Sequence, residues 1–330
     1  MDSPNGTRYS DRVAVHTPVP VESACVFLEP YAVGALRRFE GIAAGSVNSN
    51  FQVTTASGRF FLRVYEEQDN DGASREAVLL DELAHHEVPT PAPLADTTGR
   101  VIGVIADKPA ALFPWCDGHM RCQKSVTADD VMRVGEALAR VHRAGAALHR
   151  GEGRFRYEDL LQRLDTIEAS TELCEAAFGL RDKLATWTSR RNASLPRGLI
   201  HGDLFRDNVL WREDGALAAL LDFESASDGV LVYDLMVTVL AWCVGSGLDA
   251  TLCRALVAGY ERVRPLSTEE RRGLLAEGCV AALRFTITRI TDYAMRATEG
   301  PRVIKDWRRF AMRLDALERL GVEGLAEVIG

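Results

Sequence analysis

Three oxygen-bearing side chains in one short stretch could carry chemistry: Asp203, Asn208 and Asp222. Asp203 follows the apolar run 198–200, and Asp222 follows a second apolar run, 217–221. A carboxylate after a buried strand can orient a hydroxyl group and accept its proton. A second carboxylate and an amide offer the hard oxygen ligands that Mg²⁺ prefers. These are the groups that transfer of a phosphoryl group from ATP to an alcohol requires.

The spacing of these residues matches the catalytic loop of kinases. An H-x-D-L-x-x-x-N pattern begins at His201 and ends at Asn208, and Asp222 begins a D-F pair after the next apolar run. We therefore predict Asp203 as the catalytic base, Asn208 and Asp222 as magnesium ligands, and His201 as a brace of the loop. The turn signal at 213–215 predicts that the two apolar runs form a hairpin with these side chains at one end.

A small antiparallel sheet with one main helix is predicted ahead of this stretch. Segment 43–50 is small and polar throughout, and kinases use such a loop between two strands to cover the phosphates of ATP. The candidate nucleotide-binding residues here are Gly45, Ser46, Asn48 and Asn50. A plain hairpin turn stays an alternative because no G-x-G-x-x-G is present. The expected strands are 39–42, 51–55, 60–65, 101–106 and 109–115, and the expected helices are 21–36 and 71–86.

Two further features of this region suit nucleotide binding. Arg63 lies in a strand at the place where protein kinases hold the phosphates with a lysine, and Glu76 in the next helix is its natural partner. A solvent-facing arginine and an exposed glutamate are the alternatives. The last strand ends near the expected hinge, whose backbone would hydrogen-bond adenine, so Phe113 and Trp115 are further candidates.

The remainder of the chain shows helical periodicity. Thr127 with Asp130, and Ser267 with Glu270, have the spacing of capping boxes. We expect Asp234, in a buried helix, to accept hydrogen bonds from the catalytic loop. The predicted fold is α+β and protein-kinase-like, with two lobes. Its parts are a flexible tail (1–12), an ATP-binding lobe (13–115) and a mostly α-helical catalytic lobe (116–330); the expected helices of the latter begin near 127, 157, 229, 251, 267 and 303.

The short segment after Asp222 indicates the class of acceptor. A protein kinase needs a long activation segment and an A-P-E motif there, but this chain reaches the buried helix with Asp234 almost at once. We therefore expect a small alcohol as substrate. The net charge of −8 argues against a nucleic-acid partner, and the seven unpatterned cysteines indicate a cytoplasmic protein. The apolar run 229–245 is too short to be an easy membrane span. No oligomeric state is predicted.

The chain resembles the aminoglycoside/choline phosphotransferase superfamily, and within it the bacterial homoserine kinases of that fold. The resemblance implies that Asp203 is the base, that Asn208 and Asp222 bind magnesium, and that Arg63 binds the triphosphate. It runs from about Val13 almost to the end. The stretches that carry it are GSVNSNF (45–51), RFFLRVYE (59–66), LIHGDLFRDNVLW (199–211), LLDFESAS (220–227), VYDLMVTVLAWC (232–243), GYERVRPLS (259–267) and AALRFTITR (281–289).

The resemblance implies ATP-dependent phosphorylation of L-homoserine, a step in threonine biosynthesis. A site for an amino acid needs a fork-shaped cation for its carboxylate and an anion for its ammonium group. Arg284 and Arg289 on one helix are candidates for the first, and Glu224 and Asp228 for the second, although surface ion pairs would explain each arginine equally well. Choline, methylthioribose or an aminoglycoside are alternative acceptors. A nucleotide-binding protein without turnover is the alternative of another class.

Overall fold

The chain forms two compact units, Met1–Ala84 with Thr90–Cys116, and His85–Pro89 with Asp117–Gly330. The computed structural model describes residues 16–42, 47–170, 173–245, 247–295 and 305–330. Gly45, Ser46 and the expected tail 1–12 lie outside these residues. No helix within the described ranges is both long and apolar enough to cross a membrane.

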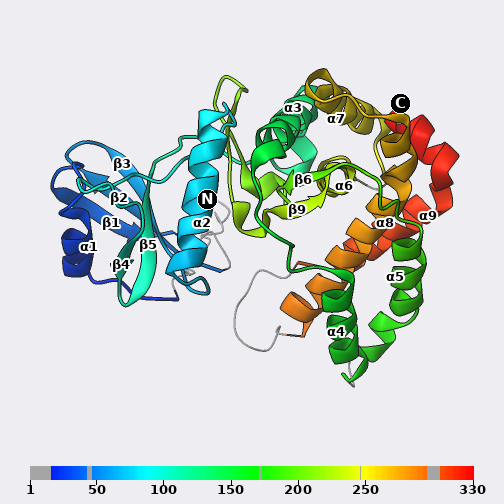
Figure 1. The fold of residues 1–330 in the computed structure, drawn as a ribbon, viewed down its shortest axis with the longest axis horizontal. Coiled ribbons are helices and arrows are strands. Elements are labelled where there is room, and N and C mark those ends of the chain that lie inside the picture. The colour runs from blue at the N-terminus through cyan, green and yellow to red at the C-terminus, as the bar shows by residue number, and fades with distance from the viewer. Residues whose placement is uncertain (1–15, 43–46, 171–172, 246, 296–304) are drawn as a thin grey trace, which may run out of the picture. The chain divides into compact units, whose positions relative to one another are not determined.

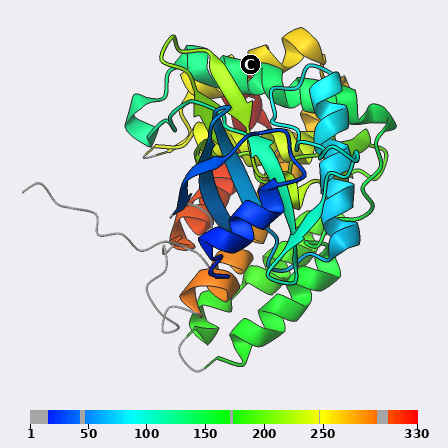
Figure 2. The same ribbon diagram turned by 90° about the vertical axis from the view of Figure 1, so that its left-hand side faces the viewer.

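The first unit is built on an antiparallel sheet with the strand order β1-β2-β3-β5-β4. One face of the sheet, which includes Leu62 and Val64 of β3, packs on α1 and the turn after it. The residues that contact this face are Phe27, Leu28 and Tyr31. Helix α2 covers the opposite face, as Figures 1 and 2 show. The elements are α1 (Val21–Leu28), β1 (Leu36–Gly41), β2 (Ser49–Thr55), β3 (Arg59–Val64), α2 (Asn70–His85), β4 (Gly103–Ile105) and β5 (Lys108–Pro114).

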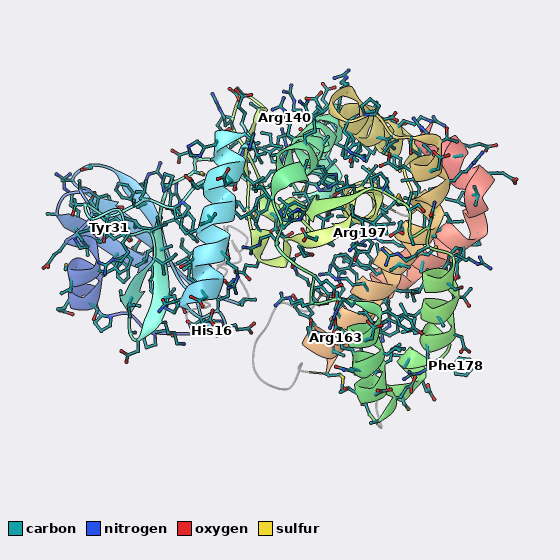
Figure 3. All side chains as sticks on the ribbon, viewed as in Figure 1. His16, Tyr31, Arg140, Arg163, Phe178 and Arg197 are labelled. Carbon is teal, nitrogen blue, oxygen red and sulfur yellow. The ribbon has the colours of Figure 1, made fainter. Side chains whose placement is uncertain are left out.

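The first predicted helix is shorter than the sequence indicated. It ends at Leu28 and not at Leu36, which instead begins β1. Pro30 follows the C-cap residue Glu29 and has no backbone N–H, so it cannot donate the next hydrogen bond of the helix. Tyr31 still packs on Phe27, with ring centroids 5.4 Å apart, so the apolar spacing that predicted a longer helix reflects burial of this turn. Tyr31 is labelled in Figure 3.

The second unit is mostly helical, with two short two-stranded sheets. The 3₁₀ turns η4 (Arg206–Asn208) and η5 (Phe223–Ser225) and the π-turn η6 (Ile290–Ala294) complete the parts that matter for the site. The main elements are α3 (Ala128–Ala144), α4 (Tyr157–Glu168), α5 (Leu180–Ser189), β6 (Arg197–Ile200), β7 (Val209–Trp211), β8 (Leu217–Leu220), β9 (Ser227–Val230), α6 (Leu231–Trp242), α7 (Ala250–Val263), α8 (Thr268–Arg289) and α9 (Arg308–Ile329).

The predicted pairing of the two apolar runs with each other is wrong. Strand β6 pairs with β9, and β8 pairs with β7, so two separate hairpin-like ladders replace the single one. The turn at 213–215 joins β7 to β8. A short turn pairs the strands on its two sides, and the strand just before it is Val209–Trp211 and not β6. The catalytic loop therefore connects two ladders, and Asp203 and Asn208 lie between them in the chain.

Helices α3 and α7 are in backbone contact where they cross. A Cβ atom on Gly135 would lie 2.1 Å from the carbonyl oxygen of Leu256, and one on Gly259 would lie 2.1 Å from that of Met132. Both positions therefore require glycine. Both predicted capping boxes, Thr127 with Asp130 and Ser267 with Glu270, are confirmed.

Helix α8 is buried along most of its length, and its C-terminal end is tied to α4. Arg163 of α4, labelled in Figure 3, contacts Asp292 at 2.5 Å. The predicted last helix, 303–320, corresponds to α9, which begins at Arg308 and continues to Ile329 past a non-helical Gly321. Helix α6 is buried beside β6, as predicted for the run 229–245 (Figure 1).

Candidate active site

Asp203 is the predicted catalytic base. Its side chain is 27% exposed, and Arg284 Nη1 lies 3.6 Å from its Oδ1 atom. Burial raises the pKa of Asp203, while the positive charges of Arg284 and Lys305 oppose this and the negative charge of Asp222 adds to it. The net shift is upward, so the carboxylate is a better proton acceptor than an ordinary aspartate.

His201, the predicted brace of the loop, is held by hydrogen bonds through both ring nitrogens. Its Nε2 atom lies 3.0 Å from the carbonyl oxygen of Leu221, and the amide of Asp203 donates to its Nδ1 atom at 3.3 Å. Both ring nitrogens are therefore engaged, with Nε2 as the donor. The ring also packs on Phe223 at 4.5 Å between centroids, which ties the catalytic loop to the segment that carries Asp222.

Asp234 holds the backbone of the catalytic loop by hydrogen bonds. Its carboxylate accepts hydrogen bonds from the amides of His201 at 2.7 Å and Gly202 at 2.8 Å, as predicted for this buried acid. His142 Nε2 donates a third at 3.1 Å. Burial alone would raise the pKa of Asp234, but the hydrogen bond and charge of His142, with the amide of Gly202, lower it. Asp234 is thus an ionised anchor.

The anchor continues as a polar chain through α3 and α7. His142 Nδ1 lies 2.7 Å from the hydroxyl of Tyr260, which accepts a hydrogen bond from Arg264 at 3.1 Å. Arg264 in turn pairs with Glu270 at 2.7 Å. Since Arg264 only donates, the Tyr260 hydroxyl gives its proton to His142, and His142 gives its own to Asp234.

Asn208 and Asp222, the predicted magnesium ligands, lie near Asp203. The Asn208 amide nitrogen donates to the carbonyl oxygen of Asp203 at 2.8 Å, which leaves the amide oxygen as an acceptor. Asp222 has the left-handed conformation with φ 62°, uncommon for a residue other than glycine and typical of strained functional positions. One amide oxygen and one carboxylate, both hard ligands, fit a magnesium ion that also binds phosphates.

Arg63 and Glu76 meet within the first unit. Arg63 Nη1 lies 3.0 Å from Glu76 Oε1, and the Glu76 side chain is only 1% exposed. Glu76 also accepts a hydrogen bond from Gln68 at 3.1 Å. Arg63 is on the face of the sheet that α2 covers, with its guanidinium 6.0 Å from the centroid of the Phe113 ring. The pair that the sequence suggested is therefore formed.

The other candidates for nucleotide binding in this unit are largely engaged in its packing. Asn48 and Asn50 are buried, and the Asn48 side chain accepts a hydrogen bond from the amide of Glu66 at 3.1 Å. Phe113 packs edge-on against Phe61, and the Trp115 ring lies 5.4 Å from the guanidinium of Arg59. These contacts shape the ends of β2 and β5.

The four residues predicted to bind the acceptor substrate fall into two groups, two arginines and two acids. Arg284 is buried beside Asp203 and donates to the carbonyl oxygen of Gly202 at 3.2 Å, and the positive charge of Arg289 interacts with the negative charge of Asp203. Asp228 instead accepts from the amides of Arg150 and Gly151, at 3.2 and 3.1 Å. Glu224, in η5, is half-buried. The structure thus brings both arginines to Asp203.

Lys305 is a residue of this site that sequence reasoning missed. Its ammonium group lies 3.6 Å from Asp207, next to the catalytic loop. Burial would lower the pKa of Lys305, but the negative charges of Asp207 and Asp203 outweigh it and raise the pKa. No local pattern marks this lysine, because it comes from a segment remote in sequence.

The fold and the catalytic loop together define a protein-kinase-like phosphotransferase. The model of the phosphotransferase enzyme family matches residues 38–266, and the chain belongs to this family. Within it, the chain is similar to homoserine kinases. The homoserine kinase of a Caulobacter species is 38% identical over 294 residues, which cover 85% of this chain and 89% of that protein. The Rhodospirillum rubrum homoserine kinase is 37% identical over 298 residues, covering 85% and 88%.

Solved structures share the fold at low sequence identity. An amicoumacin kinase in complex with AMP-PNP and Ca²⁺ has a TM-score of 0.68 and 13% identity, covering 93% of this chain and 94% of that one. A spectinomycin phosphotransferase in complex with ADP and spectinomycin has a TM-score of 0.68 and 11% identity, covering 95% and 98%. The chain is therefore an ATP-dependent phosphotransferase that acts on a hydroxyl group of a small molecule.

Proposed function

We propose that this chain transfers the γ-phosphoryl group of ATP to the side-chain hydroxyl of L-homoserine. Asp203 orients the hydroxyl and accepts its proton, while Asn208 and Asp222 hold a magnesium ion. When bound, the metal neutralises charge on the phosphates. Arg63, fixed by Glu76, contacts the triphosphate.

The observation that carries the choice of acceptor is the placing of cations around Asp203. Arg284 lies 3.6 Å from the carboxylate, and the charges of Arg289 and Lys305 interact with it. An acceptor that carries its own carboxylate is stabilised in such surroundings, whereas a polycationic aminoglycoside is repelled. The similarity to homoserine kinases over 85% of the chain supports the same choice.

Choline is disfavoured by the state of the aromatic rings that could enclose it. A quaternary ammonium ion needs open aromatic faces. The guanidinium of Arg284 lies 3.8 Å from the centroid of the Phe285 ring. Lys305 lies 5.9 Å from the ring of Tyr293, and the guanidinium of Arg308 lies 4.9 Å from that of Trp307. The protein's own cations therefore already face these three rings.

Turnover across a panel of alcohols tests the proposal. Release of ADP from ATP with Mg²⁺ is measured with L-homoserine, choline, methylthioribose and an aminoglycoside, each at several concentrations. We expect homoserine to give the highest kcat/KM, and chelation of the metal to abolish the reaction. Turnover of another alcohol with none of homoserine would refute the acceptor. Failure of every alcohol, with ATP still bound, would favour a nucleotide-binding protein without turnover.

Arg63→Met is expected to raise the KM for ATP roughly tenfold or more, because a charge-assisted contact with the phosphates is lost. The KM for the acceptor should stay close to that of the unmodified enzyme. Steady-state kinetics with each substrate varied in turn measures both.

Glu76→Gln is the matched control for this prediction. It keeps Arg63 and nearly the same volume but removes the charge that fixes it, so a smaller rise in the KM for ATP is expected. Equal KM values for ATP in Arg63→Met and the unmodified enzyme would remove Arg63 from the proposed nucleotide site.

We also place the protein in the cytoplasm. All seven cysteines lie in the described part of the chain and are free thiols, as is usual in a reducing compartment.

A further inference from the structure

Four arginines from three elements gather next to the catalytic loop. They are Arg206 of η4, Arg289 at the end of α8, and Arg309 and Arg313 of α9. Their charges act on one another: Arg313 is repelled by the other three, and Arg289 by Arg309. We call these residues the arginine cluster.

A phenylalanine forms the floor of the arginine cluster. The guanidinium carbon of Arg313 lies 4.2 Å from the centroid of the Phe310 ring, and that of Arg289 lies 4.5 Å from it. Phe205 adds a second ring, 5.8 Å from Arg289, and precedes Arg206 in the catalytic loop. Stacking on aromatic rings orients a guanidinium group and leaves its edge available for hydrogen bonds.

Among the residues that the structure describes, too few anions face the arginine cluster to balance its charge. Arg289 donates to the carbonyl oxygen of Asp306 at 3.2 Å, and Arg206 donates to that of Ala241. These acceptors are neutral. Asp207 attracts Arg206 and Arg289, but Lys305 already pairs with it, and Asp203, which also attracts Arg289, is the base. Tyr293 also acts on Arg289, and Cys122 on Arg206, and neither side chain is a carboxylate.

Arg313 experiences the strongest repulsion from the other arginines of the cluster. Its Nε atom is buried without a hydrogen-bond partner, and no ion pair of Arg313 with any described residue is formed. Burial, followed by the charges of Arg289, Arg206 and Arg309, lowers the pKa of Arg313 to about 9. A half-buried cation whose charged neighbours are cations destabilises the protein unless an anion is supplied from outside.

We infer that Arg313 and Arg289 form the subsite for the carboxylate of the acceptor. This inference rests on the proposed function and gives a role to Arg313, which takes no part in the phosphoryl transfer described above. Arg289 lies between the loop and Arg313: its guanidinium carbon is 5.8 Å from the ring of Phe205, two residues after Asp203, and 4.5 Å from the Phe310 ring on which Arg313 stacks. An acceptor with its hydroxyl at Asp203 can therefore present a carboxylate to this pair. In homoserine three carbon atoms separate the hydroxyl oxygen from the carboxylate carbon. Two guanidinium groups stacked on one ring provide the paired donors that a carboxylate accepts best.

The test compares acceptors with and without a carboxylate. Arg313→Met and Arg313→Lys are assayed with L-homoserine and with 3-aminopropan-1-ol, which is homoserine without that group. Arg313→Met should raise the KM for homoserine roughly 10- to 100-fold with kcat changed less than about threefold, and should leave 3-aminopropan-1-ol unaffected. Arg313→Lys should fall between. Arg319→Met, an exposed arginine of the same helix, is the control and should behave as the unmodified enzyme.

Two measurements without turnover separate this inference from the proposed function. Calorimetric binding of L-2-aminobutyrate, which has the carboxylate but no hydroxyl, should weaken at least tenfold in Arg313→Met. The melting temperature of ligand-free Arg313→Met should equal or exceed that of the unmodified protein, because a repelled charge is removed.

Equal losses on both acceptors, together with a lower melting temperature, would make Arg313 a structural residue and overturn the subsite. Unchanged binding of L-2-aminobutyrate would overturn it as well. A panel in which homoserine is not phosphorylated, while L-2-aminobutyrate binds and depends on Arg313, would refute the proposed function and leave the carboxylate subsite standing.

Discussion

Asp203→Asn is expected to lower kcat by roughly 10²- to 10⁴-fold, the usual contribution of a positioned general base. The amide has nearly the same shape but cannot accept the hydroxyl proton. Because Asp203 is not a proposed magnesium ligand, the affinity for ATP should change less than about threefold. Single-turnover kinetics and equilibrium binding of ATP measure the two effects. Substantial remaining turnover would count against Asp203 as the base.

The raised pKa of Asp203 adds a dependence on pH. The acid limb of kcat/KM should lie above the ordinary aspartate value of 3.8, because activity needs the ionised carboxylate. For stability the sign is opposite. An acid whose pKa is raised by folding destabilises the folded state once it ionises, so stability is gained as pH falls through the folded value.

The stability of Asp203→Asn provides the control for folding. Since the variant removes a carboxylate that is destabilising when ionised, its melting temperature at pH 7 should be no lower than that of the unmodified protein. Thermal unfolding at several pH values checks this. A clearly lower melting temperature at neutral pH would mean that the lost activity reflects a damaged fold.

Asp234→Asn is expected to lower the free energy of unfolding by about 3–5 kcal/mol, the range for removing one partner of a buried charged pair. The carboxylate accepts from two backbone amides and from His142. An asparagine side chain has only one oxygen, and its NH₂ group would face donors. We also expect kcat to fall roughly 100-fold, because the loop that carries Asp203 loses its position. Urea unfolding and steady-state kinetics measure these effects.

Thr238→Val is the matched control on the same buried helix. The Thr238 hydroxyl donates to the carbonyl oxygen of Asp234 at 2.9 Å, within its own helix. Its removal should cost about 1 kcal/mol of unfolding free energy and leave kcat unchanged. If Asp234→Asn resembled this control in both measurements, Asp234 would be an ordinary packing residue and not the anchor of the catalytic loop.

The sequence was most informative where the chemistry is contiguous. Asp203, Asn208 and Asp222 follow a fixed spacing, and the predicted α+β kinase-like fold is confirmed by the structure and by its neighbours. Strand pairing was harder, because a strand of four residues carries too little pattern to choose its partner. The run Val209–Trp211 has only three residues, too few to predict a strand, and it is the partner of β8.

Groups that act across the fold left no local signal. Lys305 and Arg313 reach the catalytic loop from segments about a hundred residues away in the chain, and each has the appearance of a solvated charge in its own helix or turn. Asp234 was found only because an acid within a strongly apolar run is anomalous. Burial of charge, which the sequence records poorly, decides these roles.

The distance between α3 and α7 where they cross affects the position of the catalytic loop through the side chains of His142 and Asp234. Gly135 and Gly259 let the two backbones meet, and His142 and Tyr260, carried by these helices, are then 2.7 Å apart. A methyl group at either glycine would widen the gap and open that hydrogen bond. His142 would lose its support, and Asp234 would lose a fixed donor. The position of Asp203 therefore depends in part on how closely the backbones of α3 and α7 approach each other.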